Sequence, residues 1–312
     1  MDKEIKVEGE SMNKRLDVYL TKKLEGEFSR NQIIAAINDG LITVNGKTAK
    51  PKYLVRNNDL VKISGLETSS ASVPLKPVEG KLDIIYEDEN LMALNKPAGL
   101  SVHPAEQNKD EITLVNYLLA YYPDIKTVGE DPLRPGIVHR LDKETSGVIV
   151  VAKNQETFLK LKNIFKRHLL QKTYLALTVG IFRDKSGCIH YPIARSKTFG
   201  KFRRAKQEEI ADGLKSREAH TQYRVLHEYQ NNYSLVEVTP LTGRTHQIRV
   251  HFATIGRPIV GDKIYGSSLD KLHPQRQFLH ASRLSFTLKQ TRYSFFSPLP
   301  ADLITLLQKL NN

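Results

Sequence analysis

The chain has 312 residues, 40% of them hydrophobic and 26% charged, which is typical of a globular protein with a large core. The net charge of +13 indicates a polyanionic partner, either nucleic acid or an acidic membrane face. A single cysteine excludes an internal disulfide and a thiolate metal cluster. The start lacks a signal-sequence pattern, and no apolar run approaches the roughly 18 residues of a membrane span, so we expect a soluble cytoplasmic protein.

Residues 11–66 predict a small α/β unit. Ser29 followed by Gln32 forms the capping-box pattern that begins a helix, and Gly40 is typical of the position at which such a helix ends. Asn45-Gly46 between alternating residues predicts a β-hairpin directly afterwards. We therefore expect helices followed by short paired strands in this part of the chain.

Residues 67–81 predict a linker, because serine, proline and charged residues dominate there without an apolar period. Residues 82–312 predict a second domain with an α+β fold, a mixed and mainly antiparallel sheet with flanking helices, because its strands follow one another with few helices between them. Strands are expected near 82–86, 91–95, 147–152, 173–179, 220–226, 233–239, 283–288 and 292–296, and helices near 113–121, 155–168, 245–255 and 301–310.

Most of the excess charge lies in residues 157–224, where 9 Lys and 7 Arg face 2 Asp and 3 Glu, a net charge of +11. Long basic side chains often only solvate a surface. Concentrating one sign of charge in about a fifth of the chain instead favours contact with a polyanion, above all through KFRRAK at 201–206.

Motifs for cofactors and metals are missing. No two of the 18 glycines are two residues apart, which excludes the GxGxxG dinucleotide fingerprint, and the chain has no Walker A loop. It has neither HExxH nor GxSxG, and its ten histidines do not pair with acids or cysteine at metal-ligand spacing. We expect neither a cofactor nor a metal.

Asp142 lies six residues before the start of VIVVA (148–152), a run with the character of a buried strand. Burial favours a neutral carboxyl group, whereas a neighbouring guanidinium keeps it charged and able to act as nucleophile or base. Structural roles remain open: a turn cap for Asp142, a core position for Tyr174 and a helix-end contact for Arg244. The candidates for chemistry, each beside an apolar stretch, are Asp142, Tyr174, Arg244, His246 and Arg249.

Five motifs from about residue 82 to residue 300 resemble those of RluA-type (RluC- or RluD-like) pseudouridine synthases, in that family's order. The motifs are NKPAGLSVHPA (95–105), HRLDKETSG (139–147), KTYLAL (172–177), LTGRTHQIRVH (241–251) and FLHA (278–281). The first 65 residues resemble the αL RNA-binding domain of a small-subunit ribosomal protein, through SRNQIIAAINDGLITVNG.

The resemblance implies an isomerase that converts uridine within RNA to pseudouridine without cofactor or metal. Such enzymes break the N1–C1′ bond, rotate the base and rejoin it through C5. The family's catalytic aspartate falls on Asp142 and its active-site tyrosine, which stacks on the base, on Tyr174. Its buried arginine falls on Arg244, the expected partner of Asp142.

The resemblance also implies substrate contacts. Arg140 is expected to fill the gap left by the flipped nucleotide, and Leu279 to line the base pocket. His139 and Lys172 lie in the same motifs and are expected to bind substrate as well. An αL domain joined to this catalytic type favours large-subunit ribosomal RNA bound by a monomer, with transfer RNA as the alternative.

Two other classes stay open. A non-catalytic RNA-binding or ribosome-associated protein would explain the charge but not the polar set around Asp142. A nuclease or glycosylase that acts on DNA has less support, because no metal motif is present, and we expect no DNA partner. The sequence also leaves open whether Asp142 attacks C1′ or removes a ribose proton.

Overall fold

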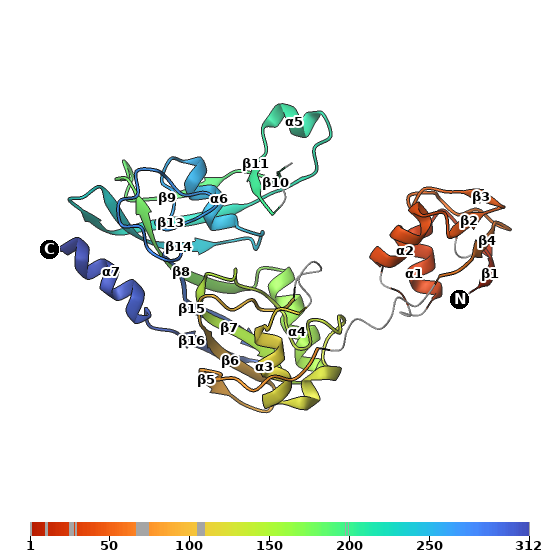
Figure 1. Ribbon diagram of the computed structural model, residues 1–312, viewed down its shortest axis with the longest axis horizontal. Helices are drawn as coiled ribbons and strands as arrows, with labels where there is room; N and C mark the ends of the chain where they lie inside the picture. Colours follow the sequence, from red (N-terminus) through yellow and green to blue (C-terminus); the bar gives the residue numbers. More distant parts are fainter. Residues whose placement is uncertain are drawn as a thin grey trace. The chain divides into compact units, whose positions relative to one another are not determined.

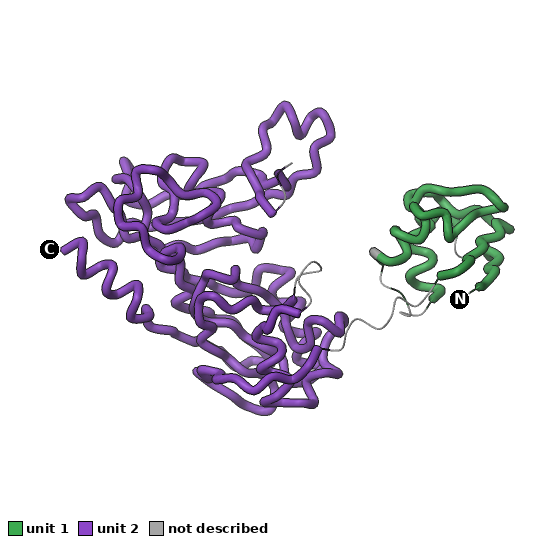
Figure 2. Tube along the Cα trace, in the orientation of Figure 1, with its two compact units in different colours: residues 1–74 green, residues 75–312 purple. Residues whose placement is uncertain are grey.

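The computed structural model describes residues 2–9, 12–24, 28, 30–66, 75–104, 110–196, 198 and 200–311. Contacts along the chain define two compact units, Met1–Pro74 and Leu75–Asn312 (Figure 2). The boundary between them falls within the predicted linker, which is described from Leu75 onward. Ser29, the first residue of the predicted capping box, lies outside the described residues.

Unit 1 combines two helices with a four-stranded antiparallel sheet. The helices are α1 (Leu16–Lys23) and α2 (Arg30–Asn38), and the strands, in sheet order, are β1 (Lys3–Lys6), β4 (Leu60–Ile63), β2 (Ile42–Val44) and β3 (Lys47–Thr48). Asn45 and Gly46 form the predicted hairpin turn, and both have positive φ angles. Apolar side chains of both helices and of the sheet form a separate core in this unit.

Unit 2 is built around a nine-stranded sheet, and every neighbouring pair in it is antiparallel except β7 and β15 (Figure 1). The strands in sheet order are β5 (Ile84–Glu87), β6 (Leu91–Lys96), β7 (Ser146–Ala152), β15 (Leu279–Leu288), β8 (Leu170–Val179), β14 (Tyr233–Pro240), β13 (His220–Tyr229) and β9 (Ser186–His190), with β16 (Thr291–Phe296) beside β15. The predicted α+β fold is confirmed.

The parallel β7–β15 pair lies in the middle of this sheet, although more than a hundred residues separate its strands in sequence. Gly147 makes the close approach possible: a Cβ atom there would lie 2.2 Å from the carbonyl oxygen of Ala281, and its φ of +114° also favours glycine. Tyr174 of β8 pairs with Ala281 on the other side of β15. The pairing therefore brings the segment before β7 close to β8.

Helices cover the sheet in two places. α3 (Leu114–Tyr121) and α4 (Gln155–Lys166) pack against β6 and β7, whereas α6 (Gln247–Thr254) lies beside β13 and β14 (Figure 1). The C-terminal helix α7 (Ala301–Asn311) buries its leucines in a further cluster. No helix within the described residues is long and apolar enough to cross a membrane.

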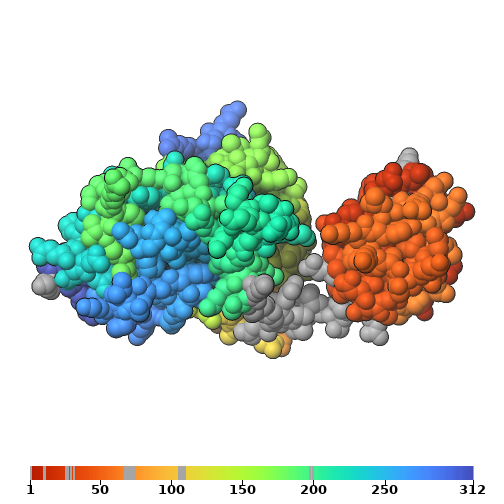
Figure 3. Space-filling view, turned by 90° about the horizontal axis from the view of Figure 1, so that it is seen from above, coloured from red at the N-terminus to blue at the C-terminus, as the bar shows by residue number. Residues whose placement is uncertain are grey.

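Residues 193–217, called the basic arm below, form a small feature that the sequence did not predict. Strands of two or three residues that contain many arginines show no alternation of apolar and polar residues. The sequence therefore gives no signal for these strands, and their pairing depends on other segments of the same chain. The arm consists of β10 (Ile193–Arg195), β11 (Phe202–Arg204), α5 (Gln207–Ala211) and β12 (Ser216–Arg217), with β10 in the centre of the sheet. In the space-filling view the arm, in green, lies beside the light-blue α6 segment (Figure 3).

Candidate active site

A cavity of about 490 Å³ opens between the segment before β7, the end of α4, the start of β8 and the segment leading into α6. The sequence-predicted site residues all line it, although they come from four separate motifs: Asp142, Tyr174, Arg244, Arg140, Leu279, His139 and Lys172. A cavity of this size is in the range that accommodates one small organic group, such as a nucleobase with its sugar.

The loop that carries Asp142 is held in place by Lys96, on its buried side. This lysine is fully buried, and its Nζ donates to the carbonyl oxygens of Pro97, Leu100 and Lys143 at 2.7, 2.8 and 3.1 Å. On the far side of the loop Arg276 donates to the carbonyl oxygen of Glu144 at 3.3 Å. Backbone atoms next to Asp142 are thus fixed by two buried basic side chains, a role that the sequence did not reveal.

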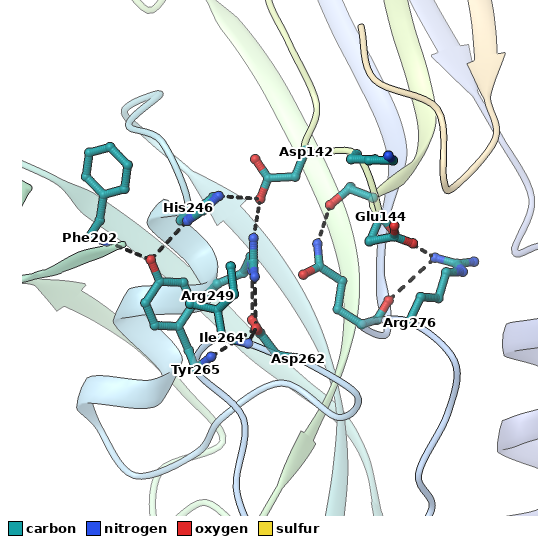
Figure 4. A network of polar contacts seen from close by, with 12 residues as sticks. Asp142, Glu144, Phe202, His246, Arg249, Asp262, Ile264, Tyr265 and Arg276 are labelled. Atoms are coloured by element: carbon teal, nitrogen blue, oxygen red, sulfur yellow. Dashed lines mark hydrogen bonds and ion pairs between the residues drawn. The ribbon is translucent and has the colours of Figure 1, made fainter. Parts of the chain in front are cut away.

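Arg249 is the partner of Asp142. Its Nη1 donates to Asp142 Oδ2 at 3.0 Å, while Nε and Nη2 bind both carboxylate oxygens of Asp262 at 2.7 and 2.8 Å (Figure 4). Burial lowers the pKa of Arg249, but hydrogen bonds and charge attraction from Asp262 and Asp142 outweigh burial and raise it. Burial raises the pKa of Asp262, and the bonds from Arg249 reverse this and lower it.

The prediction that Arg244 pairs with Asp142 is therefore wrong. Arg244 precedes α6, and its Nε donates instead to the carbonyl oxygen of Glu218 at 3.0 Å. Arg249 is buried in the first turn of the helix, and its guanidinium lines the cavity and reaches Asp142. Both arginines were visible in the same motif. The apolar residues around Arg249 in IRVHF (248–252) could have indicated that this arginine is the buried one.

His246 lies beside this ion pair. Its Nε2 is 3.9 Å from Asp142 Oδ2, and its Nδ1 is 2.9 Å from the hydroxyl oxygen of Tyr265 (Figure 4). Burial lowers the pKa of His246, although the negative charge of Asp142 opposes this. Tyr265, which also accepts a hydrogen bond from the backbone N–H of Phe202 at 2.8 Å, was not predicted from the sequence.

Three predicted residues form the wall next to β8. Burial raises the pKa of Tyr174 above its ordinary value, and it lowers the pKa of Lys172 to about 8. Lys172 has no ion-pair or hydrogen-bond partner among the described residues. Burial also lowers the pKa of His139 to about 3; its Nε2 accepts the Val150 backbone N–H at 3.0 Å, so the neutral ring fixes the loop to β7.

Arg140 and Leu279 occupy opposite environments. Arg140 is exposed at the cavity, and its Nη1 is 3.3 Å from His103 Nε2, which accepts the bond because Nδ1 of His103 lies 3.0 Å from the Pro104 carbonyl. Leu279 is only 4% exposed and forms part of the apolar wall. Within the described part of the chain, no group of three His, Cys, Asp or Glu side chains could hold a metal ion.

A mixed sheet with an acid–arginine pair in its cavity, in a chain with a net charge of +13, fits an RNA-modifying enzyme. Comparison with known proteins agrees. Residues 90–254 match the RNA pseudouridylate synthase family and residues 14–61 match the S4 domain. The chain belongs to the RNA pseudouridylate synthase family, and it is an isomerase that acts on RNA.

Similar proteins cover nearly the whole chain. An RNA pseudouridine synthase of Chlorobaculum parvum is 37% identical over 95% of this chain and 94% of its own. The ribosomal large subunit pseudouridine synthase D of Borreliella burgdorferi is 37% identical over 94% of this chain and 88% of its own. The structure of human RNA pseudouridylate synthase domain containing 1 covers 74% of this chain and 95% of its own, with a TM-score of 0.57 and 27% identity.

Proposed function

We propose that this enzyme converts uridines of large-subunit ribosomal RNA to pseudouridine and that Asp142 is its catalytic group. The choice of RNA is supported by relatives named ribosomal large subunit pseudouridine synthase D, at 37% identity in Borreliella burgdorferi and 35% in Pseudomonas aeruginosa. The S4 match at residues 14–61 adds a second RNA-binding unit to the catalytic one.

The observation that carries the catalytic assignment is the hydrogen bonding of the Asp142 carboxylate. Arg249 holds Oδ2, whereas Oδ1 has no hydrogen-bond partner among the described residues and is available to substrate in the cavity. The side chain is 20% exposed, so a bound nucleotide would reach it directly. A charged carboxylate that is oriented and only partly solvated is a competent nucleophile or base.

The proposed reaction takes place in this cavity. The target uridine leaves the RNA stack and enters the cavity, where Tyr174 stacks on the base and Leu279 supplies an apolar wall. The N1–C1′ bond breaks with its electron pair on the base, the base rotates, and C5 bonds to C1′. C5 loses one proton and N1 gains one, so the overall change is an isomerisation.

The RNA around the flipped nucleotide is held by cations at the cavity and on the basic arm. Arg140 fills the gap in the stack, and Lys172, which has no protein partner among the described residues, binds a phosphate or a base oxygen. On the arm, Arg204 stacks on Tyr191 with 3.9 Å between the guanidinium carbon and the ring centre, which leaves its outer face for RNA.

The deciding experiment measures tritium release from C5-labelled uridine in unmodified large-subunit RNA, with wild type and Asp142→Asn compared. We expect release by wild type and none by the variant. The variant should fold and bind RNA, because Asp262 still neutralises Arg249. Product from Asp142→Asn would overturn the catalytic assignment, and release from transfer RNA alone would overturn the proposed target.

A further inference from the structure

We propose that His246 is a further substrate-contacting residue: its Nε2–H donates a hydrogen bond to an oxygen of the flipped uridine. Tyr265 acts as a positioning residue that selects the required form of the imidazole. This inference rests on the proposed function, because it requires a uridine in the cavity next to Asp142.

The backbone conformation of His246 supports a functional role for this residue. Its φ of 55° and ψ of 19° lie in the left-handed region, directly before α6. That region is uncommon for residues that carry a side chain, although asparagine and histidine adopt it more readily than most, and such conformations concentrate at functional sites. The conformation turns the ring toward the cavity, where its side chain is 15% exposed.

Hydrogen bonding determines which ring nitrogen carries the proton. The hydroxyl oxygen of Tyr265 already accepts the N–H of Phe202 at 2.8 Å, and its own hydrogen needs an acceptor. His246 Nδ1, at 2.9 Å, is the acceptor in reach (Figure 4). When Nδ1 accepts, a neutral imidazole carries its hydrogen on Nε2.

The Nε2–H group then has no protein partner among the described residues. Asp142 Oδ2 lies 3.9 Å away, which is too far for a hydrogen bond, and Arg249 already donates to that oxygen at 3.0 Å. A largely buried donor without a partner is unfavourable unless a ligand supplies an acceptor. Burial lowers the pKa of His246 and so favours the neutral ring. The positive charges of Arg249 and Arg140 act in the same direction, whereas the negative charges of Asp142 and Asp262 oppose it.

A uridine offers such acceptors in O2, O4 and the 2′-hydroxyl. When the N1–C1′ bond breaks, the electron pair stays on the base and its negative charge spreads over O2 and O4. A neutral N–H donor stabilises this charge without transferring its proton, and removing one such donor typically slows a reaction by roughly 10²-fold. Contact with the 2′-hydroxyl would instead make His246 a reader of the sugar.

The test uses three variants and one control. His246→Asn tolerates the left-handed backbone, and its carbonyl can accept the Tyr265 hydroxyl, but its amide is too short to replace Nε2. His246→Gln reaches the Nε2 position. Tyr265→Phe keeps the ring and removes only the hydroxyl. His273→Asn is the matched control, because His273 also has a positive φ, of 43°, but is exposed and does not line the cavity.

Single-turnover rates would be measured on large-subunit RNA whose target uridine is unmodified, 2-thio, 4-thio or 2′-deoxy. We expect His246→Asn to slow the reaction by roughly 10²-fold, His246→Gln to restore part of the rate, and Tyr265→Phe to slow it by roughly 10-fold with unchanged RNA affinity. One of the three substrate changes should slow wild type but not His246→Asn, and that change identifies the acceptor.

The inference is wrong if all three substrate changes slow wild type and His246→Asn by equal factors. It is also wrong if His246→Asn reacts at the rate of the His273→Asn control. Thermal melts followed by circular dichroism establish that each variant is folded, and the Gln and Phe variants carry the test if Asn is unstable. Wild type without activity on every RNA tested would overturn the proposed function itself, and this inference with it.

Discussion

Arg249 donates three of the hydrogen bonds around the cavity, two to Asp262 and one to Asp142. Arg244, five residues earlier, donates its Nε to a backbone carbonyl near the surface. Both are arginines of one motif, and the family resemblance pointed to Arg244 as the partner of Asp142. Burial separates them, since a buried carboxylate requires a buried cation and a surface turn does not.

Arg249→Ala should therefore destabilise the protein far more than Arg244→Ala. Removing Arg249 leaves Asp142 and Asp262 without their cation, a loss of about 3–5 kcal/mol for a buried pair. We expect Arg244→Ala to leave stability within about 0.5 kcal/mol of wild type. Urea unfolding followed by circular dichroism measures both, and equal midpoints for the two variants would contradict the assignment of partners.

At the scale of elements, His139 connects a loop, a strand and a helix. Its Nε2 accepts from Val150 of β7, and its ring stacks on Phe165 of α4 with 4.5 Å between ring centres. The bond from Val150 requires the neutral ring, because a protonated imidazole has no free nitrogen to accept it. The loop that presents Asp142 is thus held in place by His139, whose imidazole would be protonated at low pH.

Lowering the pH should weaken this connection in a defined window. The pKa of His139 is about 3 when folded and near 6.5 when unfolded, so the unfolded chain binds the extra proton between these values. The stability that the neutral ring provides is present above pH 6.5 and falls as the pH decreases, by about 2 kcal/mol between pH 7 and pH 5.

Urea midpoints at several pH values, for wild type and His139→Gln, measure this effect. Glutamine can accept the Val150 N–H but does not titrate in this range. We expect the variant to lose less stability than wild type between pH 7 and pH 5. Parallel curves for the two proteins would show that His139 is protonated in the folded state.

For the whole molecule, the net charge of +13 favours binding to the phosphates of RNA. In unit 2, lysines of α4 contribute positive charge to the rim of the cavity. Lys166 lines the cavity and has no ion-pair partner among the described residues, whereas Lys160 of the same helix is paired with Glu156 at 2.6 Å and lies outside the cavity. Position and pairing, more than charge number, should decide which lysines meet phosphates.

Replacing Lys166 by Gln should reduce the salt dependence of RNA binding. One lost phosphate contact lowers the slope of log K against log salt by roughly 0.7 to 0.9. Lys160→Gln, the matched control, should change the slope much less. Filter binding of large-subunit RNA from low to moderate salt measures both, and an equal change for the two lysines would mean that only overall charge matters.

The sequence by itself determined most of the helices and long strands and their order, but it did not predict β1 in unit 1 or β9 in unit 2. Hydrophobic alternation located the long strands, and Asn45-Gly46 located the hairpin, because these signals depend on residues that are close in the chain. The short strands of the basic arm were missed, since their pairing depends on contacts with distant segments. The motifs likewise named the residues that line the cavity but not their partners.

Tertiary structure alone decided those partners. Asp142 meets Arg249 across 107 positions of sequence, and Asp262 meets the same guanidinium from a loop that no motif had marked. Tyr265 reaches both His246 and the basic arm in the same way. The sequence gives the type of each ionisable side chain, but its pairing, its burial and therefore its pKa depend on which distant segments lie together. In this chain the parallel pairing of β7 with β15 brings the segment that carries Asp142 close to β8.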